Sequence, residues 1–451
     1  LDMTIKYDCY VDENPNVGAT TITSGEAIVS GIRSEYPYGE KQYFHVKPKG
    51  TGYITEVSLN GYELEPETTL GEGFYSYYPA PNDQLVIRTS VDEVPNVTVG
   101  TYYIDDTGAT QPIGTGSYVV PSTSVDYSDE WAVKITAPSI EGYTTADGYF
   151  PNQDYVKFEK GTTPTINFYY SKLSTYDASA TTTSLTGAGT ETNPYLITSV
   201  ADWLYFTANA STADKSFYKL TKSLDLSGLP ATTKQFYGAR PLKPANSSDL
   251  TISESDADAA YFSGMFDGNN CSIRGISSGV TSNIPSSQQY ALGIFAVVNV
   301  DATVKNLALY GKMTSKSSHS RAGAIAGYNL GTIQNCINYV DISRPENNGG
   351  TGGIVGDMNG TGAARVDGCV NYGSISSTYT ANVAMGGIVG YFTNDKNPMS
   401  VTNCTNFGSL SSKGNYLGGI IGRTDYIKTN KITIDNCDNF SNLTYYKICY
   451  K

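Results

Sequence analysis

The C-terminal half of the chain repeats one pattern of hydrophobic and polar positions about every 33 residues. Each copy opens with a glycine-rich stretch such as "GGIVG" and continues with apolar runs of three to five residues. Strands this short cannot bury a face on their own. If each copy is one coil, every strand pairs with its equivalent in the next coil. The pattern therefore predicts a right-handed parallel β-helix over residues 189–451.

Stacked coils would give each repeated position one physical role. Equivalent residues lie ~4.8 Å apart, so columns of Ile/Val, Cys/Leu and Tyr/Phe are expected to point inward. The cysteines of these columns are expected to be inert thiols, since a disulfide needs Cβ atoms ~3.8 Å apart. Side-chain amides are expected to stack in a ladder, two positions after each cysteine, at Asn338, Asn371, Asn406 and Asn439.

One stretch of the chain has a helical pattern. It is "SVADWLYFTANAS", residues 199–211, which directly precedes the predicted coils. A terminal coil without a cover would expose its core and its strand edge. We therefore expect this helix to cap the solenoid, with Trp203 and Phe206 facing the core.

The N-terminal part predicts two small β domains, residues 1–92 and 93–172, followed by a linker over 173–188. Asn60-Gly61 lies between alternating stretches and predicts a hairpin, because both residues tolerate positive φ. Asp105-Asp106 predicts another turn, in which Asp side chains bond to their own backbone. Calcium binding by this pair is the alternative, but no dense acidic cluster accompanies it. The fold class is thus all-β throughout.

The charge balance and the hydropathy of the chain limit the classes of partner that it is expected to bind. The 451 residues carry 43 acidic against 30 basic side chains, a net charge of −13. That balance argues against nucleic acid, which needs a basic face. No stretch of 18 apolar residues occurs, so membrane insertion is not expected. The abrupt start "LDMTIKYDCY" suggests a piece of a longer exported protein, with its signal and anchor outside it.

Three regions resemble known families. "GAGTETNPYLI", "FDGN" and the tandem "GGIVG…NC.N" series look like the GLUG-motif β-helices of bacterial surface proteins, over residues 185–445. Residues 93–172 resemble mucin-binding-protein repeats, and residues 1–92 resemble the B-repeats of internalin-like proteins. These resemblances imply a secreted, cell-surface protein, expected to be a monomer, that displays or binds ligands. The implied partners are host glycans, mucin or an extracellular protein.

Catalytic and metal sites find little support in the sequence. The glycine stretches lack the following helix and lysine of a phosphate loop. The two histidines, His45 and His319, lie in no motif that supports a triad or a zinc site. The acidic candidates for glycoside chemistry share no tight motif; they are Asp225, Asp267, Asp357, Asp367 and Asp395. We therefore predict no catalytic residue, no cofactor and no metal, and a chain that is not an enzyme.

The insertions between strands are the predicted binding surface. They grow along the repeats, and insertions in solenoids gather on one face. Sugar or protein contacts are predicted for Tyr391, Phe392, Asp395 and Tyr426, with plain solvated loops as the alternative. Two other functions stay open for the chain. It could be a catalytic or non-catalytic part of a surface glycan-active enzyme or protease, or it could be a passive stalk.

Overall fold

The computed structural model describes residues 3–445, apart from 7–15, 150–154, 231–240, 243–260, 281–288, 316–320, 425–430 and gaps of one to four residues. The chain forms two compact units. The first comprises Leu1–Tyr102, Pro112–Pro138 and Gln153–Phe168, and the second comprises Tyr103–Gln111, Ser139–Asn152 and Tyr169–Lys451. The all-β prediction is confirmed, because the described elements are strands except for α1 (Val200–Ala208). The finer boundaries at 92, 172 and 188 remain predictions.

Small sheets build the first unit, and their strand pairs are antiparallel except for the parallel pair of β3 and β10. A five-stranded sheet has the order β1-β3-β10-β7-β8, and a three-stranded sheet has the order β4-β6-β9. Phe44, Val46 and Leu85 are buried between them in one core cluster. The predicted turn at Asn60-Gly61 is confirmed, with φ of 52° and 84° between β7 and β8. The strand bounds are Met3–Lys6 (β1), Thr21–Ser24 (β3), Ala27–Ser30 (β4), Gln42–Pro48 (β6), Gly52–Leu59 (β7), Tyr62–Glu63 (β8), Phe74–Tyr77 (β9) and Gln84–Val91 (β10).

Seven further strands are described in the N-terminal region. A three-stranded sheet has the order β13-β14-β16, and a two-stranded one pairs β2 with β5. β11 and β12 are longer strands joined by the turn at Asp105. The bounds are Asn16–Val17 (β2), Tyr36–Pro37 (β5), Val97–Ile104 (β11), Thr110–Val120 (β12), Asp126–Ser128 (β13), Ala132–Lys134 (β14) and Tyr155–Lys157 (β16).

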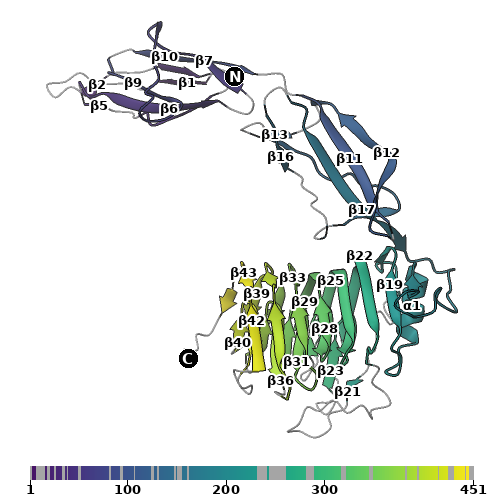
Figure 1. The fold of residues 1–451 in the computed structure, drawn as a ribbon. Coiled ribbons are helices and arrows are strands. Elements are labelled where there is room, and N and C mark those ends of the chain that lie inside the picture. The colour runs from purple at the N-terminus through teal and green to yellow at the C-terminus, as the bar shows by residue number, and fades with distance from the viewer. Residues whose placement is uncertain are drawn as a thin grey trace. The chain divides into compact units, whose positions relative to one another are not determined.

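The second unit contains a β-solenoid of about four turns, seen in Figure 1 as the strands from green to yellow. One sheet stacks β24-β27-β31-β36-β41 in parallel. A second has the order β21-β23-β26-β30-β35-β40. Their bounds are Phe295–Val298 (β24), Ala326–Asn329 (β27), Val355–Asn359 (β31), Val389–Thr393 (β36), Ile421–Arg423 (β41), and Pro241–Leu242 (β21), Gln289–Leu292 (β23), Arg321–Ala322 (β26), Gly350–Gly352 (β30), Ala384–Gly386 (β35), Tyr416–Gly418 (β40).

The third and longest face of the solenoid begins with two long strands, β22 and β25, which pair in parallel. The next coil divides the same course into β28 and β29, and the coils after it divide it into three short strands each, for example β32, β33 and β34. The bounds are Tyr143–Thr145 (β15), Thr165–Thr175 (β17), Tyr195–Ile197 (β18), Phe217–Leu220 (β19), Ser223–Asp225 (β20), Met265–Val280 (β22), Thr303–Ser315 (β25), Thr332–Gln334 (β28), Ile337–Ser343 (β29), Arg365–Asp367 (β32), Val370–Asn371 (β33), Ile375–Ser377 (β34), Met399–Thr402 (β37), Thr405–Asn406 (β38), Leu410–Ser412 (β39), Ile432–Asp435 (β42), Asp438–Asn439 (β43) and Leu443–Tyr445 (β44).

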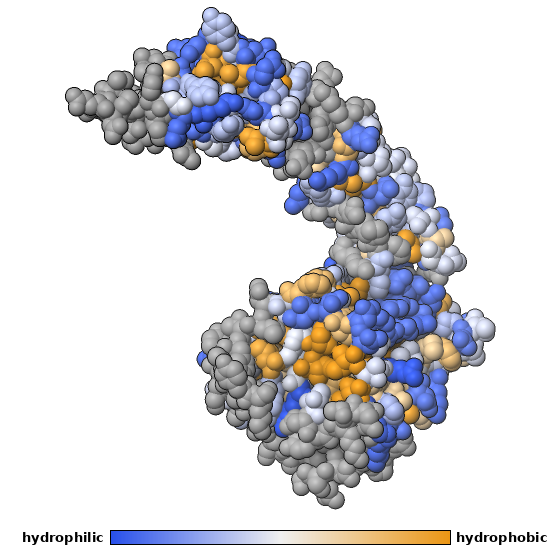
Figure 2. Space-filling view, turned by 60° about the vertical axis from the view of Figure 1, so that its left-hand side comes forward, coloured by the Kyte–Doolittle hydropathy of each residue, from blue (hydrophilic) through white to orange (hydrophobic). Residues whose placement is uncertain are grey.

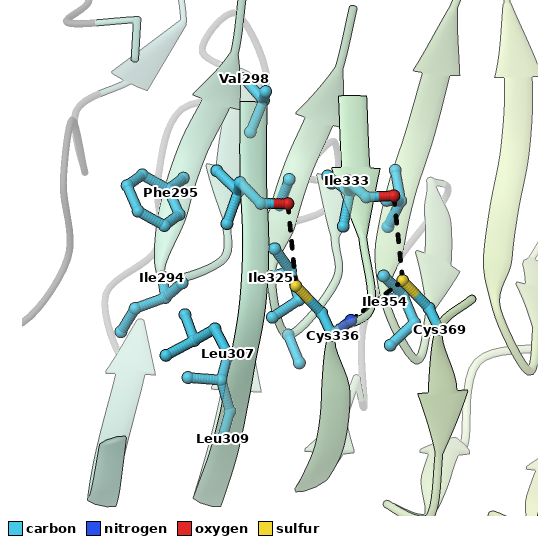
Figure 3. Close-up of a cluster of buried hydrophobic side chains, with 14 of the residues drawn as sticks. Ile294, Phe295, Val298, Leu307, Leu309, Ile325, Ile333, Cys336, Ile354 and Cys369 are labelled. Atoms are coloured by element: carbon cyan, nitrogen blue, oxygen red, sulfur yellow. Dashed lines mark hydrogen bonds between the residues drawn. The ribbon is translucent and has the colours of Figure 1, made fainter. Parts of the chain in front are cut away.

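Cysteine and aliphatic columns fill the solenoid core, as predicted. Cys336, Cys369 and Cys404 are free thiols and fully buried. Figure 3 shows Cys336 beside Ile325 and Cys369 beside Ile354, each thiol pointing to a carbonyl of the preceding coil. Cys369 Sγ lies 3.9 Å from the Ile333 oxygen. Burial raises the pKa of Cys369 well above its usual value, so the column behaves as small apolar side chains.

The predicted asparagine ladder is confirmed. Asn371 Nδ2 donates to Asn406 Oδ1 at 2.8 Å, and its own Oδ1 accepts from Asn338 Nδ2 at 2.7 Å. Asn406 continues the ladder to Asn439 at 2.8 Å. The glycine stretches fit around these amides: a Cβ on Gly353 would lie 2.3 Å from Asn371 Cγ. Glycine is therefore needed there for close packing, not for phosphate binding.

The aromatic column, predicted to point inward, lies on the outside instead. The rings of Tyr310, Tyr339, Tyr372, Phe407 and Phe440 stack face to face, with centroids 4.4 to 5.3 Å apart. Phe440 is 66% exposed at the end of the column. The reason is the period of two along a strand: Asn338 points inward, so its neighbour Tyr339 must point outward.

The surface of the solenoid carries both hydrophobic and hydrophilic side chains. Figure 2 shows an area of hydrophobic residues on the unit, bordered by hydrophilic ones. Exposed aromatic side chains contribute to the apolar surface of this unit; those most exposed include Tyr372, Phe407 and Phe440.

The predicted cap is confirmed as well. Ser199 is the N-cap of α1, and its side chain accepts a hydrogen bond from the Asp202 backbone N–H. Trp203 is fully buried, and its ring lies 6.1 Å from that of Phe266 in the first long strand. The helix thus closes the core at the N-terminal end of the coils, beside β19 and β22 (Figure 1).

Candidate binding pocket at the solenoid cap

A cavity of about 380 Å³ opens beside the capping helix. Its volume is at the small end of the range for ligand pockets, about 300–1,000 Å³. Loop, helix and strand residues combine in its wall, with aromatic rings next to a few polar groups. The lining residues are Ser184, Leu185, Gly187, Tyr195, Tyr205, Phe206, Asn209, Asp214 and Tyr218.

The loop "GAGTETNPY" forms one wall because its glycines permit a tight fold. Gly187 has φ of +117°, and a Cβ there would lie 2.0 Å from the Pro194 oxygen. Gly189 has φ of +71°, and a Cβ there would lie 2.5 Å from the ring of Tyr195. Hydrogen bonds from Leu196 N to Thr186 O at 2.7 Å close the loop on itself. The fold of this loop therefore fixes the ring of Tyr195.

Parallel pairing of two short strands sets the aromatic floor. Tyr195 in β18 lies opposite Tyr218 in β19, and their ring centroids are 5.6 Å apart. Phe206 of α1 packs on Tyr218 at 4.7 Å. Phe206 and Tyr218 are buried, whereas Tyr195 and Tyr205 are partly exposed. The pocket thus has a rigid buried floor with two phenol rings open to solvent.

Polar groups at the rim are placed by local hydrogen bonds. One oxygen of Asp214 accepts from the Ser216 backbone N–H at 2.9 Å, and the other accepts from the Tyr218 hydroxyl. Asn209 Nδ2 donates to the Tyr205 carbonyl at 2.8 Å, which holds the exposed amide at the helix end. Such carboxylate and amide groups bond well to hydroxyls, and aromatic rings pack against apolar faces. This combination suits a sugar ring, which offers both surfaces.

The two described residues among the predicted ligand contacts, Tyr391 and Phe392, lie outside the cap pocket. Tyr391 is partly buried in β36, with the guanidinium carbons of Arg321 and Arg423 at 5.8 and 5.3 Å from its ring centre. Phe392 is fully buried in the solenoid core, so its ring faces away from solvent. Asp395 and Tyr426 lie outside the described residues. The binding role predicted for these four residues stays a prediction.

Beside Tyr391 lies a buried ion pair that the sequence does not predict. Arg321 Nε donates to Asp357 Oδ2 at 2.8 Å, and the Thr393 hydroxyl donates to Asp357 Oδ1 at 2.8 Å. Burial raises the pKa of Asp357 to about 6, although Arg321 and Thr393 oppose that shift. Burial also lowers the pKa of Arg344 to about 9, and the like charge of Arg321 lowers it in the same direction. This carboxylate therefore holds two sheets of the solenoid together.

The other described acidic candidates, Asp225, Asp267 and Asp367, accept hydrogen bonds from nearby groups. Asp267 Oδ1 accepts from the Asn269 N–H at 2.9 Å, and its carboxylate pairs with Lys305 at 3.5 Å. Asp225 accepts from the Ser227 N–H at 2.9 Å. Hydrogen bonds from the Thr402 hydroxyl lower the pKa of Asp367. Within the described part of the chain, no group of three His, Cys, Asp or Glu is arranged to hold a metal ion.

The predicted turn at Asp105 is confirmed. Its Oδ1 accepts from the backbone N–H groups of Thr107 at 2.9 Å and Ala109 at 3.0 Å. The Thr107 hydroxyl, together with Gln111, lowers the pKa of Asp105 to about 2. Asp106 lies outside the described residues.

Sequence reasoning missed the cap pocket. The stretch from 184 to 218 is predicted to be the end of a linker, the start of the β-helix and its capping helix, yet it carries all three tyrosines of the described pocket lining. The signal in the sequence was the cluster of aromatic residues between Tyr195 and Tyr218.

Comparison with known proteins gives distant matches. No family model matches the chain. Halomucin of Haloquadratum walsbyi is 29% identical over 181 residues, which is 40% of this chain and 2% of halomucin. A "putative immunoglobulin A1 protease" of Bacteroides ovatus superposes with a TM-score of 0.44 at 20% identity, over 57% of this chain and 69% of that one. A structure named "IgA1 Protease" has a TM-score of 0.34 at 13% identity, over 79% of this chain and 29% of that one.

These matches correct one prediction. Both solved structures bear the name of a protease, which is an enzyme, so the prediction that this chain is not an enzyme is not supported. It rested on the lack of local motifs, whereas catalytic groups can converge from distant positions. With TM-scores below 0.5, the likeness assigns no residue of this chain a catalytic role.

A surface or extracellular module is consistent with the three matches. The resemblances to GLUG and mucin-binding sequences stay predictions. In the described residues, no helix has the length and apolar character needed to cross a bilayer.

Proposed function

We propose that this chain is a glycan-binding module of a surface or extracellular protein, and that the cap pocket is its sugar site. The observation that carries the proposal is the pairing of partly exposed tyrosines with hydrogen-bonding side chains around one 380 Å³ cavity. Tyr195 and Tyr205 supply faces for the C–H surface of a pyranose ring. Asp214 and Asn209 supply acceptors and a donor for its hydroxyls.

The pocket is also built to stay in shape. Its floor belongs to the main core cluster through Phe206 and Tyr218, and Tyr195 packs against that cluster. A rigid floor lowers the entropy lost on binding, so even a small ligand can be held. Adhesion to host glycans or mucin would follow from such a site, in line with the role implied by the sequence resemblances.

A glycan array with the full chain tests the proposal. We expect binding to a subset of glycans and to immobilised mucin, and we expect Tyr205→Ala to abolish it, because this ring is at the open side of the pocket. Tyr379→Ala is the matched control, since that tyrosine is 37% exposed on the solenoid and outside the pocket. Circular dichroism should show that both variants fold. Absence of binding by the unmodified chain, or equal binding by Tyr205→Ala, would overturn the proposal.

A further inference from the structure

We infer that the cap pocket selects an uncharged sugar at the end of a glycan chain and rejects sugars that carry a carboxylate or sulfate. This inference rests on the proposed function. It follows from the charge, the chemistry and the size of the lining.

The described lining residues include one charged group, and it is negative. Among these described residues, Asp214 is the only acidic side chain, and none is Lys, Arg or His. Lys215 follows Asp214 in the chain but does not line the cavity. An anionic sugar would lose water on entering and would meet a like charge with no counter-charge. A neutral sugar meets no such penalty.

Sugar hydroxyl groups can donate hydrogen bonds to the Asp214 carboxylate, whereas the carboxylate of an acidic sugar cannot. A carboxylate is an acceptor only, with about four lone-pair sites on its two oxygens. Two of these sites are taken by Ser216 N–H and by the Tyr218 hydroxyl. The remaining sites can accept from sugar hydroxyls, which donate. The carboxylate of an acidic sugar has no proton to donate at neutral pH.

The volume favours the end of a chain. A cavity of about 380 Å³ is near the lower limit for small-molecule pockets, about 300 Å³. It is closed at the back by Phe206 and Tyr218, which are buried in the core. A pocket with a closed back admits a terminal ring and leaves the rest of the glycan outside. An internal stretch of polysaccharide would need a groove open at both ends.

Calorimetry on the full chain with matched ligands tests the inference. The probes are a disaccharide that ends in galactose and the same disaccharide capped with sialic acid, with a second pair that ends in glucose or glucuronic acid. We expect the charged member of each pair to bind about tenfold more weakly or worse, because like charges in an interface are strongly unfavourable.

Asp214→Asn removes the charge but keeps an acceptor for the Tyr218 hydroxyl, so it should shrink the difference within each pair. Raising the salt concentration on the unmodified chain should shrink it too, and this measurement does not depend on the folding of a variant. Equal or tighter binding of the charged sugars would overturn the inference and leave the proposed function standing. Binding of no sugar in the array or by calorimetry would overturn the proposed function itself.

Discussion

The asparagine ladder makes the stability of the solenoid depend on single amides, and Asn371 is the sharpest case. Its side chain is fully buried. It donates to Asn406 Oδ1 and to the Gly373 oxygen at 2.8 and 3.1 Å, and it accepts from Asn338 Nδ2 and the Gly373 N–H at 2.7 and 3.1 Å. Asn371→Ala removes all four hydrogen bonds at once.

The cost can be worked out partner by partner. The Gly373 N–H keeps the Asn338 carbonyl at 3.1 Å, and Asn338 Nδ2 keeps the Val340 carbonyl at 3.2 Å. The Gly373 oxygen loses the Asn371 amide and becomes a buried acceptor without that donor. An orphaned buried group costs about 1–3 kcal/mol, and each other lost bond about 0.5–1.5 kcal/mol. With one orphaned acceptor and three other lost bonds, Asn371→Ala should therefore lower the free energy of unfolding by about 2.5–7.5 kcal/mol.

Urea unfolding of the full chain measures this cost. Trp203 reports on the solenoid, because it is fully buried in the cap, and a Trp131→Phe background removes the other tryptophan. Asn439→Ala is the matched control: this residue ends the same ladder but is exposed, so water replaces its bonds and the loss should stay below about 1 kcal/mol. A loss for Asn371→Ala no larger than the control's would refute the reasoning.

Three other predictions concern the solenoid. Because burial raises the pKa of Asp357 from 3.8 to about 6, the folded state binds more protons in that window. The free energy of unfolding should fall by roughly 3 kcal/mol as the pH rises from 3.8 to about 6. Denaturant unfolding of Asp357→Asn should lack this pH dependence, and the same pH dependence in this variant would contradict its assignment to Asp357. Gly390→Ala would place a Cβ 2.2 Å from the Thr351 nitrogen, so its melting temperature should drop by several degrees, about 2–4 °C per kcal/mol, and an unchanged melt would argue against the close packing. Cys369 and Cys404 should resist iodoacetamide in the native chain and react after unfolding, as mapped by peptide mass spectrometry, since they are buried; native labelling would show an open core.

The repeat made most of the solenoid predictable. Once equivalent positions are aligned, Asn338, Asn371 and Asn406 must stack, because a coil spacing of ~4.8 Å leaves amides no other partner of the same kind. The same alignment could also have predicted that the aromatic column points outward. Asn338 and Tyr339 are neighbours in one strand, so they cannot both point inward. Only the composition of the column suggested a core position.

The cap pocket could not be predicted in the same way. Tyr195, Tyr205 and Asp214 come from a strand, a helix and a loop, and no repeat relates them. They meet because β18 pairs with β19 in parallel and α1 folds over both. The buried pair of Arg321 and Asp357 shows the same limit, since its members are 36 residues apart and belong to different columns. Pairing across elements, not local pattern, places both features.

The most direct test of the glycan-binding proposal is a crystal structure of the full chain soaked with a neutral disaccharide chosen from the array. We predict density for a terminal sugar ring in the cap pocket, against Tyr195 and Tyr205 and within hydrogen-bond distance of Asp214. An empty cap pocket with the sugar bound elsewhere on the chain would contradict the proposal.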